Sequence, residues 1–335
     1  MIAPTPCPPR RSTLANAIRT AALFALASGL GLATPACASS PLAPVTLDVG
    51  GRARTTHLFV PPTPPAGLRP AVIALHGGGG RGDRFDRSTA GTLTAAAARR
   101  GWLVAFPEGV AKGWNDGRPP ATDRDRERAD VDDVAFLRAL AADLAAHHGA
   151  DPARLYVAGL SNGGFMAQRL ALDAPNTFAA FAAVAANLPT HLAASAAQGP
   201  PTPLLYVLGT DDPVVPWAGG QVEVFGLARG EVLSADASTA WWRARFGCSD
   251  GAPSITPLPD AAPDDGTRAE EHRYPGCTGA RTLALVRVAG GGHGWPGGRQ
   301  YLPERLIGRV SEDFDASERV LAFFEGRSLP PAPAR

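Results

Sequence analysis

VAGLSNGGFMAQ, residues 157–168, is the stretch from which the architecture of this chain can be worked out. An apolar run reaches Gly159, and Ser161 lies between that glycine and Gly163, directly before a helix-like segment. A serine before a helix is a common N-cap. The same spacing is also typical of a tight strand-to-helix turn that exposes the serine hydroxyl as a nucleophile, with glycines where a side chain would collide. The two interpretations predict different partners elsewhere in the chain.

Strand-like and helix-like segments alternate on both sides of this stretch. The expected strands lie within residues 45–61 (a hairpin turning at Gly50 and Gly51), 70–76, 102–109, 154–160, 178–189, 203–212 and 280–289. The expected helices lie within residues 93–101, 130–149, 162–175, 239–247 and 317–326. Near-continuous apolar strands separated by helices predict a mostly parallel, doubly wound sheet with helices on both faces. No linker long enough to divide two domains interrupts residues 39–335.

A nucleophilic serine needs a base, and one of the histidines in the chain is placed to serve. His293 lies in the loop GGGHGWPGG, directly after the last expected strand. The carboxyl ends of the strands are where open α/β sheets place their ligands, and the flanking glycines allow a close approach to another backbone. His293 is therefore the predicted base for Ser161.

The base in turn needs a carboxylate to orient it. Asp211 and Asp212 directly follow the apolar strand LLYVLG. The chain order serine, aspartate, histidine is the order used by hydrolases with this type of turn. Asp212 is preferred, because Asp211 beside Thr210 could instead fix the turn. Asp211 as the orienting carboxylate stays open as the alternative.

The tetrahedral intermediate of such a reaction needs hydrogen-bond donors for its oxyanion. The backbone N–H of Asn162, which follows the serine, is one predicted donor, and Gly77 or Gly78 in LHGGGG supplies the other. A phosphate-binding loop is the rival interpretation of these glycines, but the lysine and the dinucleotide-binding spacing are both missing. No histidine, aspartate and cysteine cluster has ligand spacing, so we expect neither a metal nor a cofactor.

The stretch 1–38 has the character of a signal peptide. Arg10 and Arg11 precede a short apolar run, and Ala36 and Ala38 have the spacing that signal peptidase accepts, with cleavage expected after Ala38. Cys37 could instead mark a lipoprotein, but the residues before it, Thr34, Pro35 and Ala36, make a poor lipobox. The sequence therefore predicts a secreted or periplasmic protein without a stable membrane anchor, and both the Sec and the Tat export routes stay open.

Charge and cysteine content narrow the class further. The formal net charge is +1, which argues against a nucleic-acid-binding surface, and Lys112 is the single lysine among the basic residues. Removal of the leader leaves Cys248 and Cys277. An even number of cysteines in an exported protein predicts one disulfide, with two buried free thiols as the alternative.

These residues together resemble the secreted esterases of the α/β-hydrolase fold that are grouped as polyhydroxybutyrate depolymerase-like proteins and feruloyl or acetylxylan esterases. The matching stretches, in chain order across most of residues 45–325, are LHGGGG, GWND, VDDVAFLRAL, GLSNGG, GTDDPVVPW and GGGHGWPGG. The resemblance implies Ser161 as nucleophile, His293 as base and Asp212 as its partner, and it also suggests the late disulfide.

The predicted function is thus a secreted serine ester hydrolase that works through an acyl-enzyme, on an ester that can be polymeric. Polyester is the first substrate class, with feruloylated or acetylated xylan as the alternative. A serine peptidase of the same fold and a non-catalytic binding protein are the weaker rivals. Trp114, Trp217 and Trp295 stand near the catalytic loops and are expected to line an apolar pocket, or else to pack in the core. The oligomeric state is left open.

Overall fold

The computed structural model describes residues 42–63, 66–174, 176–195, 202–279 and 281–330. The predicted leader and its cleavage site after Ala38 lie outside these residues, so both stay predictions. Across the described ranges, no helix is long and apolar enough to cross a bilayer.

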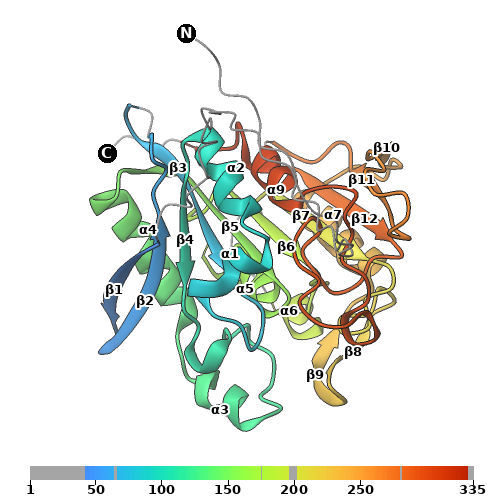
Figure 1. Ribbon diagram of the computed structural model, residues 1–335, viewed down its shortest axis with the longest axis horizontal. Helices are drawn as coiled ribbons and strands as arrows, with labels where there is room; N and C mark the ends of the chain where they lie inside the picture. Colours follow the sequence, from blue (N-terminus) through green and yellow to red (C-terminus); the bar gives the residue numbers. More distant parts are fainter. Residues whose placement is uncertain (1–41, 64–65, 175, 196–201, 280, 331–335) are drawn as a thin grey trace, which may run out of the picture. The chain divides into compact units, whose positions relative to one another are not determined.

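One twisted sheet organises the described residues (Figure 1), with the strand order β1-β2-β4-β3-β5-β6-β7-β12-β11-β10. Its strands are β1 Ala43–Val49, β2 Arg52–Phe59, β3 Arg69–Leu75, β4 Leu103–Pro107, β5 Ala150–Leu160, β6 Ala180–Val184, β7 Leu204–Gly209, β10 Ser254–Pro257, β11 Arg268–Arg273 and β12 Leu283–Ala289. In this spatial order, the neighbouring strands β4, β3, β5, β6, β7 and β12 are parallel, and antiparallel strands complete both ends of the sheet. The predicted mostly parallel α/β fold is confirmed.

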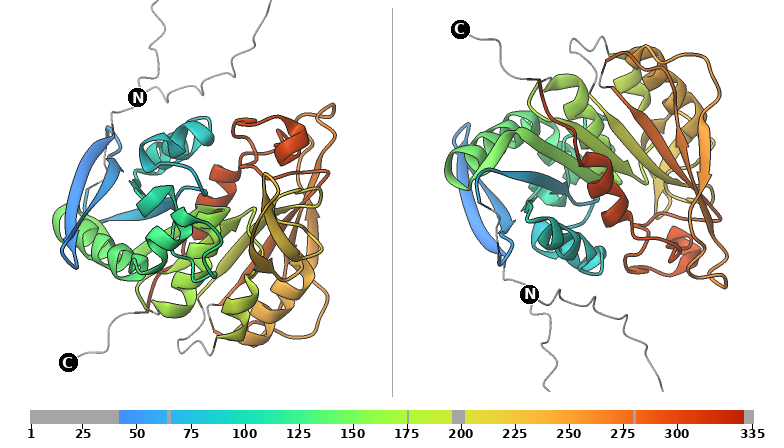
Figure 2. Two further views of the ribbon diagram at one scale, coloured as in Figure 1. Left: turned by 90° about the horizontal axis from the view of Figure 1, so that it is seen from below. Right: turned by 90° about the horizontal axis from the view of Figure 1, so that it is seen from above.

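Helices cover both faces of the sheet, as the buried apolar strands require (Figure 2). One face carries α4 Asp133–His147, α5 Asn162–Asp173 and α7 Ala235–Phe246, and the other carries α1 Gly82–Ser88, α2 Thr92–Arg100 and α9 Ala316–Phe324. Side chains of a strand alternate between its two faces. Along β3, Ile73 and Leu75 accordingly join the first core cluster, whereas Val72 and Ala74 join the second.

The helix ends follow from local capping, in which a side-chain oxygen accepts a backbone N–H of the first turn. Asp132 begins α4 by accepting a hydrogen bond from the N–H of Ala135 at 2.8 Å. Ser234 begins α7 by accepting one from the N–H of Ala237. Gly101 and Gly247 end α2 and α7 in the left-handed conformation that glycine tolerates. These ends agree with the predicted helices to within a few residues.

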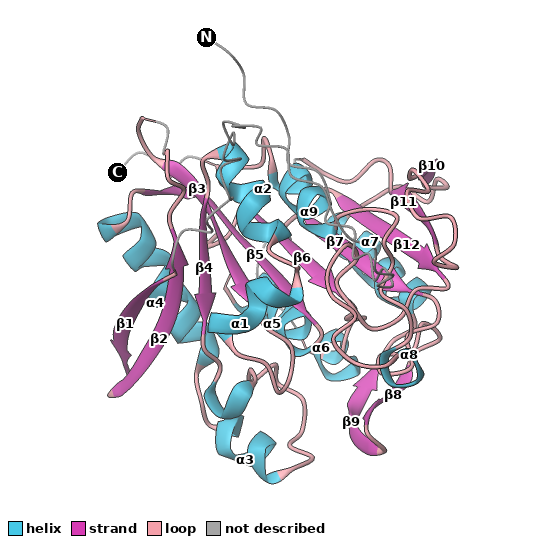
Figure 3. Ribbon diagram, in the orientation of Figure 1, coloured by secondary structure: helices cyan, strands magenta, loops and turns pink. Residues whose placement is uncertain are grey.

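Two segments of the chain form more regular structure than the sequence suggested. The Pro- and Asp-rich stretch between Cys248 and Cys277 contributes β10 and β11 to the sheet edge. The loops within 113–130 and 213–235 contain α3 Asp123–Ala129 and a hairpin of β8 Gly220–Val224 and β9 Leu227–Val232. Figure 3 shows α3 and this hairpin at the same end of the fold, beyond the carboxyl ends of the central strands.

Cys248 and Cys277 form the predicted disulfide. The bond joins the residue after the C-cap of α7 to the segment between β11 and β12. It therefore fastens the connection that leads into the last parallel strand.

Two further α-helices are short. α6 Thr190–Ala194 follows β6, and α8 Glu304–Ile307 lies between β12 and α9. Ile307 at the end of α8 is buried, and its carbonyl accepts a hydrogen bond from the N–H of His293 at 2.5 Å. The α8 segment thus holds the loop in which the predicted base lies.

Candidate active site

Ser161 occupies a strained turn between β5 and α5. Its φ is 55° and its ψ is -119°. Residues other than glycine rarely adopt such a backbone conformation. The N–H of Ser161 donates to the carbonyl of Val184 at 2.8 Å, which holds the turn in place. Ser161 is the N-cap residue of α5, but its side chain makes no capping hydrogen bond within the described chain, so helix capping does not explain the hydroxyl.

The glycines around the serine are required by close backbone approach. A Cβ at Gly159 would lie 2.1 Å from the carbonyl oxygen of Gly163, across the turn in α5. A Cβ at Gly163 would lie 2.2 Å from the carbonyl oxygen of Leu75 in β3. Neither gap admits a carbon atom, so the sequence pattern reflects the geometry of the turn itself.

His293 and Asp212 lie together at the carboxyl edge of the sheet. β7 and β12 are adjacent parallel strands, so the loops that follow them meet. The Nδ1 of His293 lies 2.8 Å from the Oδ2 of Asp212, and both side chains are buried. The backbone N–H groups of Val214 and Val215 each donate to Asp212 Oδ1 at 2.8 Å. The carboxylate is therefore fixed, and it orients the ring so that Nε2 is left for a second partner.

Asp211 has a different environment from Asp212. It is exposed, and its Oδ1 accepts a hydrogen bond from the Thr210 hydroxyl at 2.8 Å. Its own N–H donates to the carbonyl of Gly291 at 2.9 Å. Asp211 thus stabilises the turn, which was the reason to prefer Asp212 as the orienting carboxylate.

The LHGGGG loop runs past Ser161 and Asn162. A Cβ at Gly77 would lie 3.6 Å from the Ser161 Cβ, and one at Gly78 would lie 3.7 Å from the Asn162 Cβ. The N–H groups of Gly79 and Gly80 are already bonded, to the carbonyls of Lys112 and Gly77. The candidate oxyanion donors Gly77, Gly78 and Asn162 are therefore gathered around the serine.

The His76 ring holds the LHGGGG loop in place through two hydrogen bonds. Its Nε2 accepts a hydrogen bond from the N–H of Gly109 at 3.1 Å, so its Nδ1 carries the proton and donates to the carbonyl of Gly77 at 2.8 Å. Burial lowers the pKa of His76, which favours the neutral ring that this pattern needs. Both ring nitrogens are thus used to hold the loop, so the side chain is structural.

A buried polar network behind Asn162 was missed by the sequence analysis. The Asn162 Oδ1 accepts a hydrogen bond from the N–H of Trp114 at 2.7 Å, and its Nδ2 donates to Asp116 Oδ2 at 2.6 Å. Arg118 binds the same carboxylate at 2.7 Å. Burial alone would raise the pKa of Asp116, but Arg118 and the hydrogen bonds from Asn162 and the backbone hold it below its usual value. The signal was present in the sequence as GWND, where Asp116 closes a conspicuous Trp-Asn-Asp run.

A second buried carboxylate supports the same loop. Asp133 accepts hydrogen bonds from the Arg54 guanidinium and from the N–H of Asn115, both at 2.7 Å. Burial raises the pKa of Asp133, and Arg54 opposes that effect. The start of α4 therefore anchors the GWND loop to the sheet.

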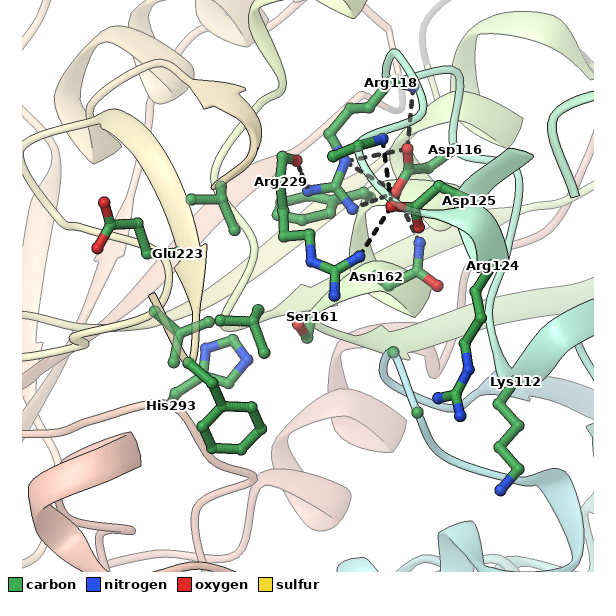
Figure 4. Close-up of a pocket in the computed structure, with 18 of the residues that line it drawn as sticks. Lys112, Asp116, Arg118, Arg124, Asp125, Ser161, Asn162, Glu223, Arg229 and His293 are labelled. Carbon is green, nitrogen blue, oxygen red and sulfur yellow. Dashed lines mark hydrogen bonds and ion pairs between the residues drawn. The ribbon is translucent and has the colours of Figure 1, made fainter. Parts of the chain in front are cut away.

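A cavity of about 510 Å³ opens over Ser161 and His293 (Figure 4). Its walls come from the LHGGGG loop, the GWND segment, α3, the β8–β9 hairpin and the segment that contains α8. The larger aliphatic and aromatic residues on the wall are Trp114, Phe165, Val214, Val222, Val224, Phe225, Tyr301, Leu302, Leu306 and Ile307. A mixed apolar and polar cavity over a serine, a histidine and backbone donors is suited to acyl transfer.

The three tryptophans have separate positions. Trp114 is buried, lines the cavity and donates its indole N–H to the carbonyl of His76 at 2.9 Å. Trp295 donates to the Ser317 hydroxyl in the core near α9, and Trp217 lies under the Arg287 guanidinium. Neither is among the residues that line the cavity. The pocket expectation is therefore corrected to Trp114, because packing against the sheet engages the other two.

No group of three or more histidine, cysteine, aspartate or glutamate side chains with metal-binding geometry occurs in the part of the chain that the structure describes.

Comparisons with known proteins point to one family. Residues 55–198 match the family described as "Esterase PHB depolymerase". The chain is 33% identical over 285 residues to "Putative esterase NocK" of Nocardia uniformis subsp. tsuyamanensis, covering 83% of this chain and 81% of that protein. It is 29% identical to "Feruloyl esterase B" of Piromyces equi over 67% of this chain, but it spans only 39% of that protein.

Among solved structures, the chain is similar to the acetyl xylan esterase from Aspergillus awamori. The identity is 17% and the TM-score 0.48, with 72% of this chain and 89% of that chain covered. A second structure, described as native sOPH, covers 84% of this chain and 99% of that chain, with 19% identity and the same TM-score.

Proposed function

Because the chain belongs to the PHB depolymerase family of esterases, we propose that it hydrolyses carboxylic esters with Ser161 as the nucleophile. The observation that carries the proposal is the hydrogen bond of 2.8 Å between His293 Nδ1 and Asp212, at the edge of the cavity that Ser161 also lines. A histidine oriented in this way presents Nε2 to a serine hydroxyl, which is a weak nucleophile without a base.

In the first half of the reaction, the Ser161 Oγ attacks the ester carbonyl carbon while His293 Nε2 accepts the hydroxyl proton. The carbonyl oxygen becomes an oxyanion, which the N–H groups of Asn162 and of Gly77 or Gly78 stabilise. Gly78 is the better candidate of the two glycines, because it lines the cavity. The carbon–oxygen bond to the alcohol then breaks, and the His293 imidazolium returns the proton to the departing alcohol oxygen.

In the second half, water replaces the alcohol. His293 Nε2 accepts a proton from the water as its oxygen attacks the acyl-enzyme carbonyl carbon. The same backbone donors stabilise the second oxyanion. The bond from the carbonyl carbon to Ser161 Oγ breaks, the proton passes from His293 to Oγ, and a carboxylic acid leaves. Asp212 stays ionised throughout and stabilises the imidazolium.

We propose a polyester of hydroxy acids as the substrate class. Four of the exposed large apolar side chains in the described residues lie on the two segments that edge the cavity: Phe225 at 71%, Leu227 at 52%, Tyr301 at 43% and Leu306 at 37% exposed. Exposed apolar groups that cluster at a pocket mouth are typical of a binding surface. An apolar polymer surface is one that this rim could contact while a chain end enters the cavity.

We also propose that the protein acts outside the cytoplasm. The support is the leader-like sequence of the stretch 1–38 and the Cys248–Cys277 disulfide. Such bonds persist in oxidising compartments. Mass spectrometry of the protein from culture medium and periplasm tests this, with a mature N-terminus at Ser39 as the expected result. Retention of the full chain inside the cell would contradict it.

A substrate panel tests the proposed function. Short p-nitrophenyl esters, a polyhydroxybutyrate film, methyl ferulate and acetylated xylan are assayed with the wild type and with Ser161→Ala. Turnover of the p-nitrophenyl esters and release of hydroxy acids from the film, both lost in Ser161→Ala, are expected. Selective turnover of methyl ferulate or acetylated xylan would replace the polyester class. Cleavage of a peptide amide, without turnover of any ester in the panel, would replace esterase activity with peptidase activity.

A further inference from the structure

Positive charge is concentrated on the wall of the cavity that Ser161 lines. Among the described residues, the basic lining side chains are Lys112, Arg118, Arg124, Arg128, Arg229 and Arg305, and the acidic ones are Asp116, Asp125 and Glu223. Arg118 neutralises Asp116, and Asp125 is shared between Arg128 and Arg229. The wall therefore carries an excess of positive charge that is not balanced by its own carboxylates.

Three of these cations have no ionic partner within the described parts of the chain: Lys112, Arg124 and Arg305. Lys112 and Arg124 lie on the same side of Ser161, across from Glu223 (Figure 4). They come from the 3₁₀ turn Val110–Lys112 and from α3, which pack against each other. The fold thus brings two unneutralised cations to one wall of the cavity.

The backbone at Lys112 is unusual. Ala111 has a φ of 50° and Lys112 a φ of 58°, so two consecutive residues with side chains adopt the left-handed conformation. Strain of this kind persists where the surroundings fix it, often at ligand sites. Here the carbonyl of Lys112 accepts the N–H of Gly79 at 2.7 Å, which ties the base of the lysine side chain to the LHGGGG loop.

Lys112 is also the single lysine of a chain whose other basic side chains are mostly arginines. An ammonium on a flexible stem acts as a point charge, and a guanidinium binds a carboxylate with two parallel hydrogen bonds. The pair is therefore suited to one planar anion that enters the cavity together with the scissile ester.

We propose that Lys112 and Arg124 form a subsite for a carboxylate of the substrate, so that esters bearing a free carboxylate are preferred over neutral ones. The inference rests on the proposed ester hydrolysis at Ser161. The carboxylate can belong to the acyl part or to the alcohol part. The terminal unit of a hydroxy-acid oligomer is of the second kind, because its alcohol oxygen is esterified while its carboxyl group is free.

Two pairs of substrates distinguish these sources. The first pair compares p-nitrophenyl monoadipate, which carries a carboxylate in its acyl part, with the neutral p-nitrophenyl ester of adipamic acid. The second pair compares 3-acetoxybutyrate, which carries a carboxylate in its alcohol part, with the neutral 3-acetoxybutyramide. In at least one pair we expect kcat/KM to favour the anion by roughly tenfold in low salt. The preference should decline toward one in about 0.5 M NaCl, because salt shortens the range of exposed charges.

Variants assign the preference to the two side chains. Lys112→Gln and Arg124→Gln should each lower the anion-to-neutral ratio of kcat/KM by about threefold or more, whereas Lys112→Arg should retain most of it. Arg52→Gln is the matched control, because Arg52 is an exposed arginine of β2 that does not line the cavity. Its ratio should equal that of the wild type.

The single lysine allows a chemical test on the unmutated enzyme. Acetylation of amines removes the charge of Lys112, and reductive dimethylation keeps it. Acetylation should therefore lower the ratio and dimethylation should not, with Lys112→Gln as the blank for reaction at the N-terminal amine. One outcome would overturn the subsite alone: the neutral esters are turned over, the anion-to-neutral ratio of kcat/KM is one or less in both pairs, and Lys112→Gln leaves that ratio unchanged. Absence of turnover with the neutral and the charged esters alike would overturn ester hydrolysis, and the subsite with it.

Discussion

Replacement of Asp116 by asparagine should impair catalysis through Asn162, although Asp116 lies behind the residues that are predicted to react. Asp116 Oδ2 accepts the side-chain N–H of Asn162 at 2.6 Å and that of Arg118 at 2.7 Å. An asparagine has one acceptor oxygen where Asp116 has two, so its amide nitrogen would face a donor. We expect the Asn162 side chain to shift, and with it the backbone N–H that is proposed to bind the oxyanion.

The magnitude follows from the two roles of the carboxylate. Loss of an oxyanion donor costs about 10²–10³ in kcat, and a displaced donor costs less, so a fall of about 10- to 100-fold in kcat is expected. Arg118 would lose its charged partner in a buried site, so the free energy of unfolding should also fall, by about 3 kcal/mol. KM should change less than kcat, because the oxyanion that this donor is proposed to bind forms only as the reaction proceeds.

The pH dependence of stability gives an independent check. Burial alone would raise the pKa of Asp116, but Arg118 and the hydrogen bonds hold this pKa below its usual value. The unfolded chain therefore binds this proton first as pH falls. The contribution of Asp116 to stability is complete above the unfolded value of about 3.9 and is lost as pH falls below it. Urea unfolding between pH 3 and 7 should show a smaller acid loss in Asp116→Asn than in the wild type.

Asp125→Asn is the matched control for this variant. Asp125 also lines the cavity and pairs with Arg128 and Arg229, but its carboxylate bonds to those arginines and to Thr122 rather than to Asn162. It should lose stability and keep kcat within about threefold of the wild type. Steady-state rates with p-nitrophenyl acetate compare the two. Equal losses of kcat in both variants, or a normal kcat in Asp116→Asn, would refute the link from Asp116 to the oxyanion site.

Asp212→Asn should lower kcat by roughly 10⁴ and Asp211→Asn by less than about threefold, measured on a p-nitrophenyl ester, and the reverse order would reassign the orienting carboxylate. Reduction of the Cys248–Cys277 bond should lower the free energy of unfolding by about 3 kcal/mol, and an unchanged melting temperature would contradict this. Because burial lowers the pKa of His76, the wild type should lose stability as pH falls below about 6.5, and a His76→Asn variant should lose less over the same range.

The sequence was sufficient to predict the central sheet and the grouping of the candidate residues. Short, continuous apolar runs bounded by glycine or proline are typical of buried strands, and helices between such strands favour parallel neighbours. The carboxyl ends of parallel strands lie at one edge, so Ser161 after β5, Asp212 after β7 and His293 after β12 were expected to meet. The structure places Ser161 and His293 on the wall of one cavity, and a hydrogen bond joins His293 to Asp212.

The antiparallel strands at the β12 edge could not be predicted in the same way. β11 lies between β12 and the edge strand β10 and has charged side chains such as Glu270 and Arg273, and among its residues only Ala269 and Glu271 are buried. A strand with so little apolar surface has no strong periodic signal. Its position depends on pairing with β12, which is a property of the folded chain.

The support of the oxyanion site was also beyond the sequence. Asn162 and Asp116 are 46 residues apart, and their contact depends on how the GWND loop crosses the end of β5. Trp217 and Trp295 show the converse error, since nearness in sequence to Asp212 and His293 did not bring them to the cavity. Local patterns identify residue types, but which side of a loop faces the cavity is decided by packing.

The nucleophilic role of Ser161 is tested most directly by trapping the acyl-enzyme. The wild type and Ser161→Ala are mixed with a p-nitrophenyl ester, quenched in acid within milliseconds, digested and analysed by mass spectrometry. The wild-type peptide that contains Ser161 should carry one acyl group, Ser161→Ala should carry no adduct, and turnover in that variant should fall by a factor on the order of 10⁶. A Ser161→Ala protein that retains a tenth of the wild-type rate, or an acyl group on a different residue, would contradict this role of Ser161.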